Sequence, residues 1–540
     1  MLDIRFFPSY SMAHPGNFIG TAKVVSLSLS LILYPAHPHF ISVTYRFKKG
    51  GGIMKKLFSV VCLCALVSFA LLIVVQTGCK SAKSDEVPIT TISKEARQLF
   101  VEGRELADFS QGEKANALFK RAVELDPDFA LAYLFKAGTS LDTTEFKADR
   151  AKAISLAPKV SEGEQKLIAA HQAYNDENNV VKANEIYREL AAMFPKDKRA
   201  QYYLATSYDS LQEFDKEIAA LENVIALDKY YSLAYQTLGY VYRWKNQYDK
   251  AEANFKEYLR QNPKQASGYD NLADLYQKMG RFDEAIAQYR ESVRIDPSLR
   301  FSEMKIGVTY AFMGKYGEAR QALQALMDSE TKPAFKLYDQ QVIARTYIYE
   351  GDYAKALEAT DKAMQMAKEL GLPEDLGYGH QVKFILFFEL ADWDKADASL
   401  AEMLNIAETA NFTPANKETY EAVVPFWGAQ VAAGRKDFAA AQAKADEFKA
   451  KVVAVNNPGW QKYPGWCFGY IALAQGDAIK AIEYFSQGEM DDPFIMYYFA
   501  VAKEKAGDTA GALELYKKIA TWNFDGDWYA IVRAKAAAKI

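Results

Sequence analysis

The sequence predicts an all-α protein, built as a solenoid of stacked helix hairpins. Prolines recur in register, with 34 residues from Pro263 to Pro297 and twice that distance from Pro195 to Pro263. Between these prolines, apolar residues follow the 3.6-residue period of a helix. A chain of 540 residues is too long for one compact core. An array avoids this limit because each unit packs only on its neighbours.

One unit of the array begins at Tyr235. Tyr235, Leu238 and Tyr242 lie at i, i+3 and i+7, which places them on one face of a first helix. Gly239 adds a small residue to this face and lets a second helix approach closely. Pro263 ends the second helix, because proline lacks an amide hydrogen and clashes with the preceding turn. Each unit is therefore predicted to be two antiparallel helices joined by a short turn.

The same unit resembles the tetratricopeptide repeat, in which Ala and an aromatic residue, here Ala251 and Phe255, mark the second helix. The resemblance covers about residues 95–525, and it is closest over 198–330 and weakest over 128–163. It implies a right-handed superhelical solenoid of roughly 11–12 helix-turn-helix units. Matching residues in other units are Gly103, Ala115, Phe119, Ala122 and Pro127; Tyr269, Leu272, Ala273, Tyr276, Ala285 and Tyr289; and Gly469, Ala481, Phe485 and Pro493.

The array has two predicted parts. Residues 95–333 carry the clearer repeats, and residues 334–540 carry a degenerate continuation. The polar stretch 328–333 lies between them, so either one continuous array or two sub-arrays are expected. Residues 528–540 are predicted to form a capping helix, which covers the face that the last repeat would otherwise expose.

The start of the chain has the features of an export signal. Within residues 54–78, two lysines precede an uncharged run at 57–75. Cys79 follows Thr and Gly at the end of this run, which resembles a bacterial lipobox and implies lipid attachment to Cys79. Gln76 departs from that pattern, and an uncleaved membrane-spanning helix is the alternative. Residues 79–94 are expected to be a flexible tether.

Residues 1–53 have no helical or strand period. Met54 with its two following lysines is typical of a bacterial start, and the Lys and Gly residues just before it match a purine-rich ribosome-binding site read in frame. We therefore expect residues 1–53 to be an upstream artefact or disordered. The alternative is a genuine N-terminal extension.

The charge distribution argues against nucleic acid as the partner. Residues 1–78 hold seven of the 65 basic residues and one of the 69 acidic residues, which leaves residues 79–540 with a net charge of −10. Binding to phosphates needs a basic stripe, and no such stripe is evident in the sequence.

The sequence carries no pattern that indicates catalysis. The body contains only His171 and His380, and neither has a neighbour at metal-ligand spacing. No phosphate-binding loop or nucleophile motif is evident. Two short acidic segments, at 491–492 and 525–527, weakly resemble parts of a calcium-binding loop. They lack its other ligands, so their acids are interpreted as turn residues. With Cys467 alone in the body, no disulfide forms within the mature chain. No enzyme activity, cofactor or metal is expected.

The concave side of the first helices is the predicted partner site, because the resemblance implies a peptide-binding groove there. Aromatic, Met and Arg side chains at such positions suit interface anchors, although Trp244 and Phe312 could instead pack between units. The positions lack the Lys and Asn clamp of chaperone-binding relatives. The predicted residues are Tyr202, Gln236, Tyr240, Arg243, Trp244, Asp270, Asp274, Met304, Phe312, Gln341 and Arg345.

These features predict a non-catalytic scaffold that is anchored by lipid in the bacterial cell envelope, on the periplasmic side, and binds partner proteins or peptides. Lys80 after the lipidated cysteine favours the outer membrane. The alternative function is capture of a ligand or glycan, because sugars stack on tryptophan rings. An enzyme with an unrecognised second-half domain is a third interpretation. The second half carries Trp427, Trp460, Trp466, Trp522 and Trp528.

Overall fold

The structure is a computed structural model that describes residues 85–540 except 110, 141, 178, 411–413, 456–462 and 488–491. The described residues form helices and connecting turns, and contain no strand. The all-α prediction is therefore confirmed. The predictions for residues 1–78 and for Cys79 lie outside the described residues.

The helices form twelve consecutive hairpins within the described residues, followed by one further helix. The first six hairpins are α2 (Lys94–Asp108) with α3 (Gly112–Leu125), α4 (Ala130–Gly138) with α5 (Thr143–Leu156), α6 (Glu162–Asn175) with α7 (Val180–Met193), α8 (Lys198–Asp209) with α9 (Phe214–Leu227), α10 (Ser232–Trp244) with α11 (Tyr248–Gln261), and α12 (Ala266–Lys278) with α13 (Phe282–Ile295).

The second six hairpins are α14 (Arg300–Phe312) with α15 (Tyr316–Ser329), α16 (Pro333–Glu350) with α17 (Tyr353–Leu370), α18 (Pro373–Glu389) with α19 (Trp393–Thr409), α20 (Pro414–Gly434) with α21 (Phe438–Val455), α22 (Tyr463–Gln475) with α23 (Ala478–Phe485), and α24 (Pro493–Lys505) with α25 (Thr509–Ala520). Helix α26 (Asp527–Ala537) ends the array.

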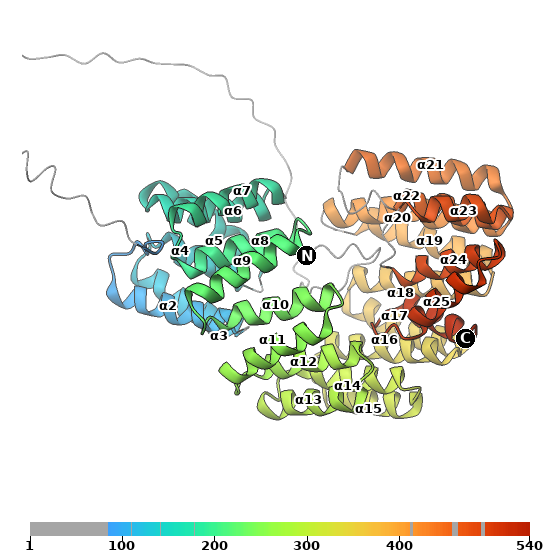
Figure 1. Cartoon of the computed structure of the whole chain (residues 1–540), viewed down its shortest axis with the longest axis horizontal. Helices are drawn as coiled ribbons and strands as arrows, with labels where there is room; N and C mark the ends of the chain where they lie inside the picture. The colour runs from blue at the N-terminus through green and yellow to red at the C-terminus, as the bar shows by residue number, and fades with distance from the viewer. Residues whose placement is uncertain are drawn as a thin grey trace, which may run out of the picture.

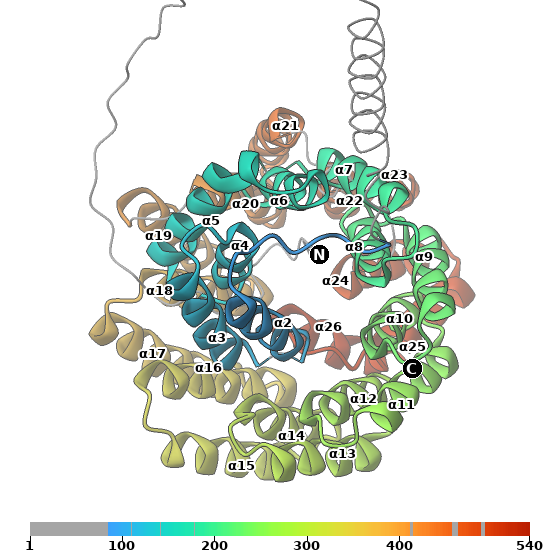
Figure 2. The ribbon, with the colours of Figure 1, turned by 90° about the vertical axis from the view of Figure 1, so that its left-hand side faces the viewer.

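The hairpins stack in chain order into a superhelix. Helices α2–α9 form the first part, α10–α15 the middle, and α16–α25 the last part (Figure 1). Viewed along the long axis, the hairpins wind around a central opening (Figure 2). The predicted hairpin solenoid is therefore confirmed, and even the poorly matching stretch 128–163 forms the hairpin of α4 and α5.

Small residues let the two helices of a hairpin approach closely, as predicted. A methyl group added to Gly239 on α10 would lie 2.4 Å from the Phe255 ring on α11. The equivalent distances are 2.8 Å from Gly103 to Phe119 and 2.7 Å from Gly469 to Phe485. Each of these phenylalanines is fully buried. The aromatic residue therefore fills the space above the glycine of its own hairpin.

The apolar core continues through the polar stretch at 328–333. One hydrophobic cluster extends from Met304 on α14 to Ala536 on α26. Helices α15 and α16 also pack directly on each other across that stretch. The break in the sequence pattern therefore does not interrupt the packing.

Both ends of the described chain lie against the superhelix. Helix α26 returns to pack on α16, α18, α24 and α25, inside the last part of the superhelix (Figure 2). At the other end, residues 85–93 cross the opening in front of α4 and α8 (Figure 2). The Val87 amide donates to the Asp197 carboxylate at 2.8 Å, and the Thr90 amide donates to Glu164 at 2.8 Å. This part of the predicted tether is therefore held by hydrogen bonds to α6 and to the start of α8.

Among the described residues, no helix combines the length and the apolar character needed to cross a membrane. The uncharged run at 57–75 lies outside the described residues.

Candidate partner-binding cavity

A cavity of about 440 Å³ lies on the concave side of the superhelix. The first helix of every hairpin from α10 to α24 contributes to its wall, and residues 523–529 close it. Six of the predicted partner-binding residues line the cavity: Arg243, Trp244, Asp274, Met304, Gln341 and Arg345.

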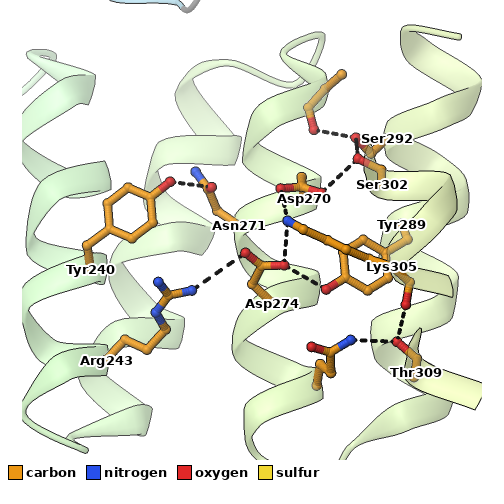
Figure 3. Close-up of polar contacts among 12 residues, drawn as sticks. Tyr240, Arg243, Asp270, Asn271, Asp274, Tyr289, Ser292, Ser302, Lys305 and Thr309 are labelled. Carbon is orange, nitrogen blue, oxygen red and sulfur yellow. Dashed lines mark hydrogen bonds and ion pairs between the residues drawn. The ribbon is translucent and has the colours of Figure 1, made fainter. Parts of the chain in front are cut away.

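One wall of the cavity is a network of charged side chains on α10, α12 and α14 (Figure 3). The Lys305 ammonium group lies 2.8 Å from both Asp270 and Asp274. Asp274 also accepts a hydrogen bond from the Tyr289 hydroxyl at 2.6 Å, and Arg243 lies 3.7 Å from it on the other side. The network pairs two cations with two carboxylates, so it holds this wall rigid without a large net charge.

The pKa values of the two carboxylates in this network are shifted in opposite directions. Burial raises the pKa of Asp270, and the neighbouring Asp274 adds to the rise. Burial acts in the same direction on Asp274, but Lys305 and Arg243 outweigh it and lower the pKa of Asp274. Asp274 therefore remains the charged partner of both cations at neutral pH.

Arg345 on α16 joins the array to the C-terminal segment. Its guanidinium group donates to Asp527 at 2.9 Å and also pairs with Asp525. It donates to the Tyr378 hydroxyl at 2.8 Å, and that hydroxyl donates to Asp527 at 2.8 Å. The Tyr349 hydroxyl donates to Asp525 at 3.1 Å. Asp525 and Asp527 were interpreted as turn residues, and their pairing with Arg345 was not predicted. This pairing engages the side chain of Arg345, which was predicted to face the groove.

The cavity also has an aromatic wall in the second half of the chain. Trp427 on α20 and Trp528 on α26 stack with ring centres 4.3 Å apart and planes 11° apart. Phe494 on α24 packs edge-on against Trp528 at 4.5 Å, and Trp466 is buried beside the same cavity. The richness in tryptophan after residue 420 is the sequence feature that pointed to this wall. Trp460 lies outside the described residues.

The other five predicted partner-binding residues do not line this cavity. Tyr202 shares a hydrogen bond of 3.0 Å with Thr237. Tyr240 donates its hydroxyl to Asn271 (Figure 3), and its ring packs on Phe255 at 5.3 Å. Gln236 is half-buried on α10, and Asp270 is half-buried and pairs with Lys305, which itself lines the cavity. Phe312 is the fifth predicted residue that does not line the cavity.

Phe312 is packed inside the protein. Its side chain is only 4% exposed, its ring lies 5.5 Å from Tyr349, and the Arg533 guanidinium lies 5.5 Å from its centre. Met304 is only 6% exposed, and Gln341 donates to Asp375 at 2.9 Å. Both side chains are therefore held in the cavity wall, one by packing and the other by a hydrogen bond. Trp244 is different, because 37% of its surface is exposed. It is the most accessible of the predicted anchors.

No group of three His, Cys, Asp or Glu side chains in the described residues is arranged to hold a metal ion. Cys467 is buried, and burial raises the pKa of its thiol well above the usual value. A thiol held in this neutral form is a weak nucleophile. These observations identify no centre for catalysis in the part of the chain that the structure describes.

Two sequence families match the middle of the chain. Both are described as tetratricopeptide repeat, one over residues 230–298 and the other over residues 172–232. No curated protein gives a significant match.

Several solved structures are similar to parts of the chain. A tetratricopeptide repeat protein from Parabacteroides merdae is 17% identical and aligns over 53% of this chain and 100% of its own length, with a TM-score of 0.31. A thermophilic protein of the same kind from Thermus thermophilus is 21% identical over 40% of this chain and 98% of its own, with a TM-score of 0.27. The C-terminal part of a repeat-containing protein from Cytophaga hutchinsonii is 16% identical over 45% and 96%, with a TM-score of 0.32.

Proposed function

Because this chain is a tetratricopeptide-repeat protein, we propose that it is a non-catalytic scaffold that binds a partner protein or peptide in its concave cavity. The observation that supports the proposal is the convergence of predicted groove residues on a single cavity. Arg243 and Trp244 on α10 face the same space as Met304 and Gln341, two and three repeats further along. A cavity lined by aromatic, Met and Arg side chains has the composition of an interface core.

The size of the cavity limits what it accepts. A volume of about 440 Å³ suits a short extended peptide segment or a few side chains of a folded partner. The C-terminal segment already fills the concave side around Arg345, so a long helix would not fit there without displacing it. The proposed partner therefore enters beside Trp244, where the wall is most exposed.

Pull-down of native partners from bacterial membranes tests the proposal. Trp244→Ala removes the exposed anchor and is expected to reduce capture of the specific partner at least about tenfold, as for an interface hot spot. Tyr230→Ala is the matched control, because Tyr230 is an aromatic residue that is 65% exposed and does not line the cavity. Equal capture by wild type and the folded Trp244→Ala variant would eliminate the proposed site.

The scaffold is further proposed to be attached to the bacterial envelope through a lipid on Cys79, on the periplasmic side and with the outer membrane preferred. Asp85, six residues after Cys79, pairs with Lys196 at 3.3 Å, just before α8. Six extended residues span only about 20 Å. A lipid on Cys79 would thus hold the first part of the superhelix close to the membrane surface.

A second candidate function is capture of a small ligand or glycan. The stacked Trp427 and Trp528 and the cavity that they line favour it, because aromatic-lined pockets are typical of small-molecule sites. Quenching of tryptophan fluorescence by a panel of oligosaccharides separates the two functions. Saturable quenching that is lost in Trp427→Ala would support ligand capture, and its absence together with partner binding would support the scaffold.

A further inference from the structure

A second cluster of polar side chains lies where α2 meets α8. The Asp108 carboxylate, at the end of α2, accepts two hydrogen bonds from the Arg199 guanidinium on α8, at 2.7 and 3.0 Å. The two residues are 91 positions apart, and their pairing closes the first part of the superhelix. Helices α2, α8 and α10 border the central opening at this end (Figure 2).

Arg104, one turn before Asp108 on α2, has no equivalent partner. Its Nε atom is buried without a hydrogen bond, and its side chain makes no ion pair with any residue that the structure describes. Burial lowers the pKa of Arg104 and the positive charge of Arg199 lowers it further, whereas Tyr203, Asp108 and Tyr231 raise it. Arginine nevertheless keeps its proton. The cluster therefore holds two cations and a single carboxylate.

Tyr231, which precedes α10, adds an unpaired hydroxyl to the same cluster. Its side chain is only 7% exposed, and its hydroxyl is buried without a hydrogen-bond partner. Arg199 and Arg104 both interact electrostatically with this tyrosine. Buried donors without an acceptor are rare, because each loses the hydrogen bonds it would make in water.

We propose that Arg104, Arg199 and the Tyr231 hydroxyl form a binding site for a small oxyanion, either a phosphate or a carboxylate. An oxyanion supplies the missing negative charge and accepts hydrogen bonds from the guanidinium and the hydroxyl. A guanidinium group donates two parallel hydrogen bonds to two oxygens of a phosphate or carboxylate. Chloride is a single atom and cannot accept such a pair. None of these three residues lines the proposed partner cavity.

Thermal unfolding of the purified chain in three buffers of equal ionic strength tests the site, with chloride, acetate or phosphate as the anion. Wild type is expected to melt at least about 3 °C higher in phosphate or in acetate than in chloride. A rise in phosphate alone assigns a phosphate site, and a rise in acetate alone assigns a carboxylate site. An equal melting temperature in all three buffers would overturn the proposal.

Three variants assign any shift to these residues. Arg104→Gln is expected to abolish the oxyanion-dependent rise and, in chloride, to melt no lower than wild type, because it removes an unpaired charge. Arg97→Gln removes one positive charge from the exposed side of the same helix and is expected to keep the full rise. Tyr231→Phe removes only a hydroxyl, so it tests the site even where Arg104→Gln fails to fold, and it is expected to reduce the rise. An undiminished rise in folded Arg104→Gln or Tyr231→Phe would contradict the site.

Discussion

Arg345 on α16 and Asp527 at the start of α26 form an ion pair of 2.9 Å across 182 positions of sequence. This pair and its partner Asp525 bind the C-terminal segment to the concave side of the array. Helix α26 then packs on α16, α18 and α24 as well as on its neighbour α25. The last helix is therefore part of the cavity wall in addition to covering the end of the array.

Replacing Arg345 with Met is expected to destabilise the protein strongly. Asp525 and the 7% exposed Asp527 would lose their shared cation, and a buried charge without its partner costs about 3–5 kcal/mol. Urea unfolding together with hydrogen exchange of α26 measures the loss. Arg294→Gln, which breaks an exposed pair with Glu291, is the control and should change little. Equal stability of the two variants would show that the Arg345 pairing is not needed to hold α26.

Gly239→Ala is expected to destabilise the array, because the added methyl would lie 2.4 Å from the buried Phe255 ring. Overpacking of this kind costs about 1–3 kcal/mol. Gly317→Ala is the control, because an added methyl on that helical glycine meets nothing within 4 Å. Its greater helix propensity should leave stability unchanged or raise it by up to about 1 kcal/mol. Chemical denaturation compares the two, and similar midpoints would contradict the close packing of α10 on α11.

His171 is expected to make stability depend on pH. Burial, aided by Arg150, lowers the pKa of His171 from 6.5 to about 4 in the folded protein. Above pH 6.5 both the folded and unfolded forms hold neutral His171, and the full stability is present. As pH falls towards 4 the unfolded state binds a proton first, and up to about 3 kcal/mol of stability is lost.

Unfolding free energies measured between pH 7 and pH 4 test this expectation for His171. His171→Gln should remove this part of the pH dependence, whereas His380→Gln should retain it. A wild-type profile that matches the His171→Gln profile over this range would show that His171 titrates normally.

Cys79 is expected to carry the lipid. Metabolic labelling with an alkyne fatty acid should label the wild-type protein, and Cys79→Ser should lose the label. The N-terminus of the mature protein should then map to Cys79. Unlabelled protein that retains residues 57–75 would favour the uncleaved helix, and native peptides from before Met54 would show that the first 53 residues are translated.

The repeats could be predicted from the sequence because their packing is local. Gly239 and Phe255 belong to one hairpin, and their spacing recurs at Gly103 with Phe119 and at Gly469 with Phe485. A contact that recurs at a fixed spacing leaves a periodic pattern, so the hairpins and their order followed from it.

The closure of the cavity could not be predicted in the same way. The contacts of Arg345 with Asp525 and Asp527, and of Trp427 with Trp528, occur once each and join distant parts of the chain. The positions of these residues do not recur at a fixed spacing in the sequence. The choice between groove and packing for Phe312 could not be made from the sequence for the same reason, because the Arg533 side chain that covers it comes from α26.

The partner cavity is tested most directly by a photo-crosslinking amino acid placed at position 244 in living cells. The side chain there would point from the exposed edge of α10 toward the cavity occupant. A discrete adduct with one partner protein is expected from position 244, and none is expected from position 230, which is exposed outside the cavity. No adduct from either position, or the same adducts from both, would contradict the proposed partner cavity.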